Sequence, residues 1–159
     1  MIFVFLLLFS NGIQAQTVQP QLNQVELIKQ FIGSWKGEIS KDTIVTSEIK
    51  SFGTGGIEGY QTTLLKDKII SEETNVWGYD KKRDKYLCAR IWKANPEVSL
   101  MEFRFTSENT CERIPFGCLS SSEPNASKAI YEFKSKDLIV KTDIINDKVT
   151  KTFTFTRVK

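Results

Sequence analysis

The chain has 159 residues, of which 40% are hydrophobic and 11% aromatic, so it can form one domain with a substantial core. Lys and Arg number 22 against 19 Asp and Glu, and the net charge is +3. The basic residues are mixed with acidic ones along the chain, which excludes the concentrated positive charge typical of nucleic-acid-binding proteins. The apolar content also argues against an intrinsically disordered chain.

The N-terminal segment predicts export. An unbroken apolar run from Ile2 to Phe9 is followed by polar residues and by the ending Ile13-Gln14-Ala15. This pattern predicts a signal peptide of residues 1–15, although no Lys or Arg precedes the run. The alternative is a buried N-terminal strand or helix. A bilayer span needs about 20 apolar residues, so we expect no integral membrane span and a periplasmic or extracellular domain of residues 16–159.

A short helix is predicted next. Between Gln21 and Ile32 the apolar residues recur at steps of three and four, which is the spacing of an amphipathic helix. These positions are Leu22, Val25, Leu27, Ile28, Phe31 and Ile32. Gly33 ends the pattern.

From Gly33 onward the pattern changes to period two, which predicts about ten strands with turn residues between them. Short links imply an up-and-down meander, and closing the meander into a barrel removes its exposed edges. The expected fold is therefore all-β, a single antiparallel up-and-down barrel with a short N-terminal helix. The predicted strands are Ser34–Ser40, Thr43–Phe52, Ile57–Leu65, Lys68–Tyr79, Lys85–Trp92, Glu97–Ser107, Thr110–Pro115, Lys128–Ser135, Leu138–Ile145 and Val149–Val158.

The first and last strands carry a pair of residues that closure would bring together. Trp35 shares one strand face with Gly37 and Ile39, opposite a charged face. In a closed barrel these strands are neighbours, so Arg157 is expected to cover the Trp35 ring by stacking or a cation–π contact.

These motifs resemble a known superfamily. A helical turn that leads Gly33-x-Trp35 into the first strand, with Arg157 on the last, resembles the calycin superfamily of lipocalins and fatty-acid-binding-type barrels. The segment Trp77-Gly78-Tyr79-Asp80 followed by Tyr86 resembles, more narrowly, a bacterial group of secreted lipocalin-like domains. The resemblance covers Gln21 to Lys159. It implies a barrel that binds a small hydrophobic or amphipathic molecule inside, as a carrier or sensor.

The candidate lining of this barrel mixes aromatic and polar side chains, and the aromatic ones are equally suited to a packed core. One face carries Tyr86, Cys88, Arg90 and Trp92. If it points inward, Arg90 and Tyr86 could clamp a carboxylate head group. If it points outward, Arg90 pairs with a glutamate of a neighbouring strand, which is the orientation we favour. The candidate lining residues are Gln61, Trp77, Tyr86, Arg90, Phe103, Phe105, Tyr131 and Phe133.

Three cysteines follow the predicted signal peptide. Cys111 and Cys118 flank a Pro/Gly turn, so in an oxidising compartment they could form a disulfide if their Cα separation allows it. Cys88 would then pack as a small apolar side chain.

Enzyme chemistry is disfavoured. The chain has no histidine, which removes the commonest general base, metal ligand and proximal haem ligand. Its three cysteines lack the paired spacing of a zinc site, so we expect neither metal nor cofactor. Two alternatives to ligand binding remain. One is an interaction or structural module with a filled barrel, working through its outer face or through the loop from Cys111 to Ser127. The other is an acid/base enzyme using Glu73 or Tyr131.

Overall fold

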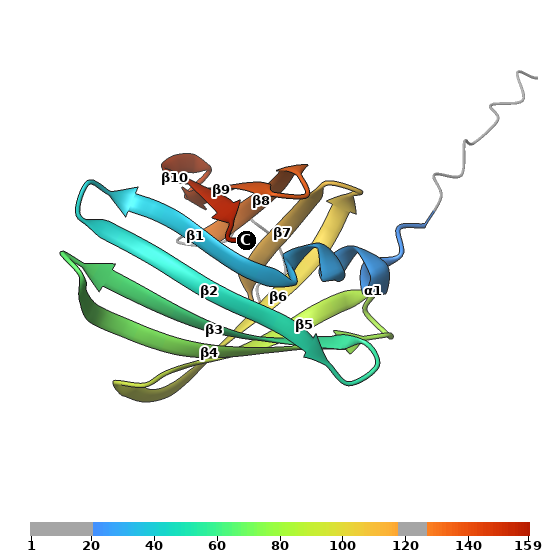
Figure 1. Cartoon of the computed structure of the whole chain (residues 1–159). Helices are drawn as coiled ribbons and strands as arrows, with labels where there is room; N and C mark the ends of the chain where they lie inside the picture. Colours follow the sequence, from blue (N-terminus) through green and yellow to red (C-terminus); the bar gives the residue numbers. More distant parts are fainter. Residues whose placement is uncertain (1–20, 118–126) are drawn as a thin grey trace, which may run out of the picture.

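The computed structural model describes residues 21–117 and 127–159, and within them it forms a closed antiparallel β-barrel (Figure 1). Each strand pairs with its neighbours in the sequence, and the last pairs with the first. The strands are β1 (Gly33–Ser40), β2 (Thr43–Phe52), β3 (Gly56–Leu65), β4 (Lys68–Asp80), β5 (Lys85–Trp92), β6 (Asn95–Ser107), β7 (Thr110–Pro115), β8 (Ser127–Ser135), β9 (Leu138–Ile145) and β10 (Lys148–Arg157).

The predicted fold class is confirmed, and the strand bounds agree with the predicted ones to within a residue or two. The hairpin turns explain this agreement. Lys66 and Asp67 between β3 and β4, and Asn146 and Asp147 between β9 and β10, all have positive φ angles. Two successive residues of this kind form the turn whose twist matches that of the flanking strands.

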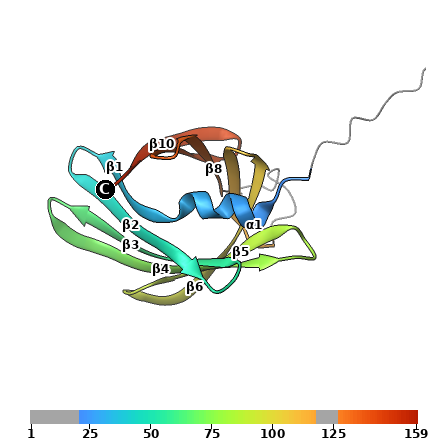
Figure 2. The same cartoon turned by 45° about the vertical axis from the view of Figure 1, so that its right-hand side comes forward.

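The N-terminal helix is shorter than predicted. It consists of α1 (Gln24–Leu27) and a 3₁₀ turn (Ile28–Phe31). In a 3₁₀ turn, residues three apart lie on one side, and both Ile28 and Phe31 are buried. Figures 1 and 2 show the helix lying across one end of the barrel. No helix among the described residues is long and apolar enough to cross a membrane.

Two hydrogen bonds attach the helix to the barrel wall. The Gln24 side chain donates from Nε2 to the Phe105 carbonyl (2.9 Å) and accepts from the Phe105 amide (2.7 Å). Gln24 is almost fully buried, so both of its polar groups are satisfied where water cannot reach them.

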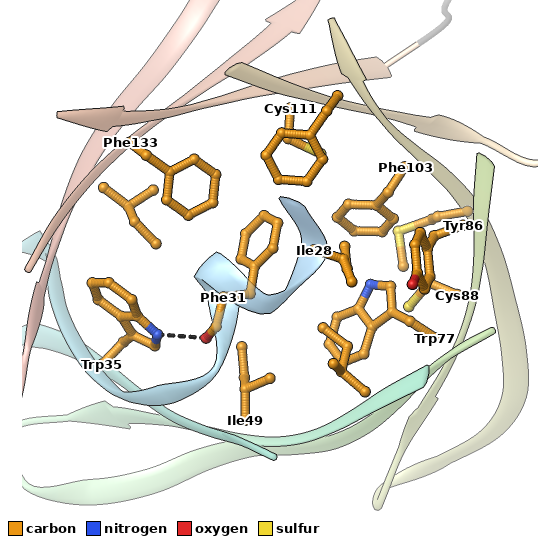
Figure 3. Close-up of a cluster of buried hydrophobic side chains, with 14 residues drawn as sticks. Ile28, Phe31, Trp35, Ile49, Trp77, Tyr86, Cys88, Phe103, Cys111 and Phe133 are labelled. Atoms are coloured by element: carbon orange, nitrogen blue, oxygen red, sulfur yellow. Dashed lines mark hydrogen bonds between the residues drawn. The ribbon is translucent and has the colours of Figure 1, made fainter. Parts of the chain in front are cut away.

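The hydrophobic core lies at this helix-covered end. Phe31 projects into the middle of the ring of side chains in Figure 3. It makes edge-to-face contacts with Phe133 (centroids 4.9 Å apart), Tyr131 (5.3 Å) and Phe103 (6.3 Å), an arrangement that aromatic rings prefer. The barrel therefore packs around the helix rather than leaving this end open.

The predicted contact between the first and last strands is confirmed. Trp35 and Arg157 are register partners, and the guanidinium carbon lies 4.2 Å from the ring centroid. Arg157 also donates from its side chain to the carbonyls of Ile32 (2.5 Å) and Lys136 (2.9 Å). A Cβ at Gly33 would lie 1.9 Å from Arg157 Nη1, so only glycine leaves room for this guanidinium.

We predict that Arg157→Gln lowers the free energy of unfolding by about 2 kcal/mol, because it removes a cation–π contact and charge-assisted hydrogen bonds. Arg104→Gln removes the same charge from an exposed position on β6 and should change stability by less than about 0.5 kcal/mol. Urea unfolding of both variants measures the two free energies of unfolding. Equal stabilities for the two variants would contradict the role given to Arg157.

Candidate ligand-binding cavity

A cavity of about 140 Å³ lies inside the barrel against Phe31. Its apolar wall is largely aromatic and includes Phe31, Trp35, Trp77, Phe103, Phe153 and Phe155, with Ile39, Val45, Ile49 and Ile139. Its polar lining comes from Ser47, Tyr60, Gln61, Asn75, Arg90, Tyr131 and Lys141. The cavity is thus amphipathic, because apolar surface and hydrogen-bonding groups line the same space.

Arg90 points into the barrel, which contradicts the outward orientation favoured from the sequence. It shares a strand face with Tyr86 and Cys88, which are almost fully buried, and alternate residues of a strand point the same way. Because Tyr86 and Cys88 point into the core, Arg90 on the same strand face also points inward. The expected partnership with a glutamate of the next strand is present, but it lies inside the barrel.

Three side chains form the first polar group in the interior. Arg90 donates from Nε to Asn75 Oδ1 (2.9 Å) and lies 3.2 Å from Glu73 Oε1. Asn75 Nδ2 donates to the same glutamate oxygen (3.3 Å). Glu73 and Asn75 are 5% and 4% exposed, and a buried carboxylate needs such partners. Glu73 is thereby held in an ion pair, which argues against its use as a free general base.

Tyr86 and Arg90 do not form the predicted carboxylate clamp. They lie four residues apart on β5, which is about 13 Å along a strand. The Tyr86 hydroxyl donates instead to the Gly55 carbonyl at the helix-covered end. Burial raises the pKa of Tyr86 to about 12, so its hydroxyl stays protonated and serves as a structural donor.

A second polar group lies on the inner faces of β7 and β9. Lys141 Nζ is 3.1 Å from each carboxylate oxygen of Asp143, and Arg113 approaches the same carboxylate at 3.7 Å. The Lys141 ammonium also lies 5.2 Å from the centroid of the Phe153 ring. Sequence reasoning missed Lys141. The sequence does contain a signal for Lys141. It lies two residues after Ile139 on the same strand, so the two side chains share a face, and Ile139 is buried.

The structure divides the eight predicted lining residues into two sets. Five of them line the cavity: Gln61, Trp77, Arg90, Phe103 and Tyr131. The other three are buried in the core around the helix and away from the cavity lining: Tyr86, Phe105 and Phe133. Cavity residues not predicted as lining include Phe31, Ile39, Val45, Ser47, Ile49, Ile139 and Lys141.

Among the described residues the Cys111 thiol has no disulfide partner, and it is fully buried; the Cys111–Cys118 disulfide stays a prediction. Cys118 lies outside the described residues. Cys111 is the register partner of Phe105 and Tyr131, and its side chain joins the hydrophobic core. It therefore points into the barrel. Cys88 is also free and buried, as predicted. Among the described residues, no three His, Cys, Asp or Glu side chains gather as a metal site would require.

We predict that neither core thiol reacts in the folded protein. Burial raises the pKa of Cys88 to about 12 and raises that of Cys111 further above its usual range, so at pH 8 only about one molecule in ten thousand carries the reactive Cys88 thiolate. A Cys118→Ser variant should resist a thiol reagent when folded and react twice when unfolded. Rapid labelling of the folded variant would contradict this burial.

The same reagent tests whether Cys111 is bonded to Cys118. If the two are not bonded, the unreduced wild-type chain, once unfolded, should show three reactive thiols, since it has three cysteines. A Cys111–Cys118 bridge would leave one.

Comparison with known proteins finds a likeness in fold. No family model matches the sequence, and no curated protein matches it. Among solved structures, the S-type phycobiliprotein lyase CPES from Guillardia theta is similar, with a TM-score of 0.53 and 16% identity. The match covers 84% of this chain and 92% of the lyase. The chain therefore shares a lipocalin-like barrel fold with that lyase, and at this identity the likeness concerns the fold alone.

Proposed function

We propose that the barrel is an exported carrier or sensor of the calycin superfamily that binds a small hydrophobic or amphipathic molecule in its cavity. The observation that carries the proposal is the amphipathic cavity itself. Ligand sites in proteins are typically enclosed and mostly apolar, with a few polar groups that orient the ligand. Aromatic rings together with Gln61, Asn75 and Arg90 provide this combination here.

The cavity size restricts the ligand. About 140 Å³ is less than the roughly 300–1,000 Å³ of sites that hold drug-sized molecules. It is close to the ~150 Å³ of an apolar cavity that binds benzene. A ligand that enters without opening the barrel is therefore small. The similarity to the phycobiliprotein lyase supports the lipocalin-like barrel fold.

Ligand binding should be visible in two measurements. Native mass spectrometry of protein purified from its own host should show an added small-molecule mass. Bound ligand also raises the melting temperature, since it stabilises only the folded state. Absence of any added mass, together with no melting shift against a panel of lipids and smaller amphiphiles, would contradict the proposal.

A matched pair of variants places the binding inside the barrel. Ser47 lines the cavity, and its neighbour Thr46 faces the other side of β2. Ser47→Leu should fill the cavity and abolish the ligand-induced melting shift, and Thr46→Leu should preserve it. Loss of the shift in both variants, or in neither, would place the ligand elsewhere.

Export is proposed from the N-terminal apolar run, Ile2 to Phe9, and the ending at Ala15. These residues lie outside the described part of the chain. The protein recovered from its host should begin at Gln16, which intact-mass measurement can check. A chain that retains Met1 to Ala15 would contradict cleavage.

One observation favours a second function, that of an interaction module. The exposed apolar side chains of β4, β5 and β6 include Val76, Ile91, Val98 and Leu100 on their outer faces. Ile91 and Val98 are register partners, so part of this surface is continuous. Exposed apolar patches often mark protein contacts.

A further inference from the structure

We propose that the ligand is a small aromatic anion, such as a single-ring carboxylate, with its ring among the aromatic side chains and its carboxylate at Arg90 and Lys141. This inference rests on the proposed function and narrows it to one chemical class. Three independent features of the interior carry it: the balance of charge, the free hydrogen-bond donors, and the shape of the apolar wall.

The first feature is the balance of charge. In the described residues, the two polar groups of the interior contain three cations, Arg90, Arg113 and Lys141, against two carboxylates, Glu73 and Asp143. Three positive charges minus two negative ones leave one positive charge. The three cations are largely buried, with side-chain exposures of 19%, 13% and 18%, and a charge largely withdrawn from water is stabilised by a nearby opposite charge. A ligand with one negative charge supplies that partner.

The second feature is the free donors of Arg90. Its Nε is engaged by Asn75 and Glu73, while its two terminal nitrogens donate no hydrogen bond to a described residue. A guanidinium has five N–H donors in a planar fork, and two of them can bind one carboxylate side by side. Because Asn75 and Glu73 already hold the Nε side, the guanidinium is oriented before a ligand arrives.

Lys141 contributes from the other side of the cavity. Its ammonium has three N–H donors and contacts Asp143 and the face of Phe153. Both Lys141 and Arg90 line the cavity, although they come from β9 and β5, which are not neighbours in the barrel. An anion between them would be bound from two sides.

The third feature is the aromatic wall. Trp77 and Phe103 meet edge-to-face with centroids 5.9 Å apart, and Phe153 and Phe155 line the cavity from β10. Aromatic rings favour such edge and offset contacts with another ring. At about 140 Å³, the cavity accommodates one ring, since an apolar cavity of ~150 Å³ binds benzene, and it is too small to enclose a long acyl chain.

Calorimetric titration of the mature protein with four probes tests this class. Benzoate and phenylacetate carry a ring and a charge, benzyl alcohol carries the ring alone, and hexanoate carries the charge on an aliphatic chain. We expect at least one of the aromatic acids to bind about tenfold or more tightly than both benzyl alcohol and hexanoate, because charge-assisted hydrogen bonds and ring contacts then act together.

Two variants separate recognition of the charge from the stability of the barrel. Lys141→Met removes one cation. The double variant Arg90→Met with Glu73→Gln removes an ion pair without leaving a buried charge unpaired. Each should weaken binding of the aromatic acid about tenfold and change the affinity for benzyl alcohol by less than about twofold. Arg104→Gln, on the outer face of β6, is the charge-matched control and should change neither affinity.

The outcomes distinguish this inference from the proposed function. If benzyl alcohol binds as tightly as the acids, or the variants weaken both equally, the anion assignment is wrong. If long-chain amphiphiles bind and the aromatic acids do not, the inference fails and the ligand-binding function stands. If no probe of any class binds and no molecule accompanies the native protein, both fail.

Discussion

The contact between Arg157 and Trp35 is the constraint on which the barrel depends. It joins the first strand to the last, and a meander without this pairing would expose two strand edges. The same residues fix the helix. The indole Nε1 donates to the Phe31 carbonyl (2.7 Å), shown by the dashed line in Figure 3, and the guanidinium donates to the Ile32 carbonyl. Barrel closure and helix placement are thus one arrangement of hydrogen bonds, and the cavity inside the barrel follows from it.

Alternation along the closed strands then gives the interior two chemical characters. Near the helix the inward residues are aromatic and pack around Phe31. Further from the helix, the inward residues of the same strands are polar. Asn75 follows Trp77 in this direction on β4, and Arg90 follows Cys88 on β5. The cavity lies where these two regions meet. An amphipathic ligand matches this order, because its apolar part can lie towards the helix.

Most of the fold could be predicted from the sequence, because period-two patterning and turn residues are local signals. The interior was harder, because it depends on which way each strand faces. Arg90 was assigned outward from its own charge, although the aromatic and thiol side chains on its face had to be buried. Lys141 was missed for the same reason: a charged residue usually marks a solvent face. The predicted Cys111–Cys118 disulfide rested on proximity along the chain. Proximity did not indicate that the Cys111 side chain faces the hydrophobic core.

A crystal structure of the protein purified from its own host, without unfolding, tests the central claim most directly. We expect electron density for a small molecule between Trp77 and Arg90, inside a barrel closed by pairing of β1 with β10. A cavity filled by repacked side chains, or first and last strands that lie apart, would contradict it.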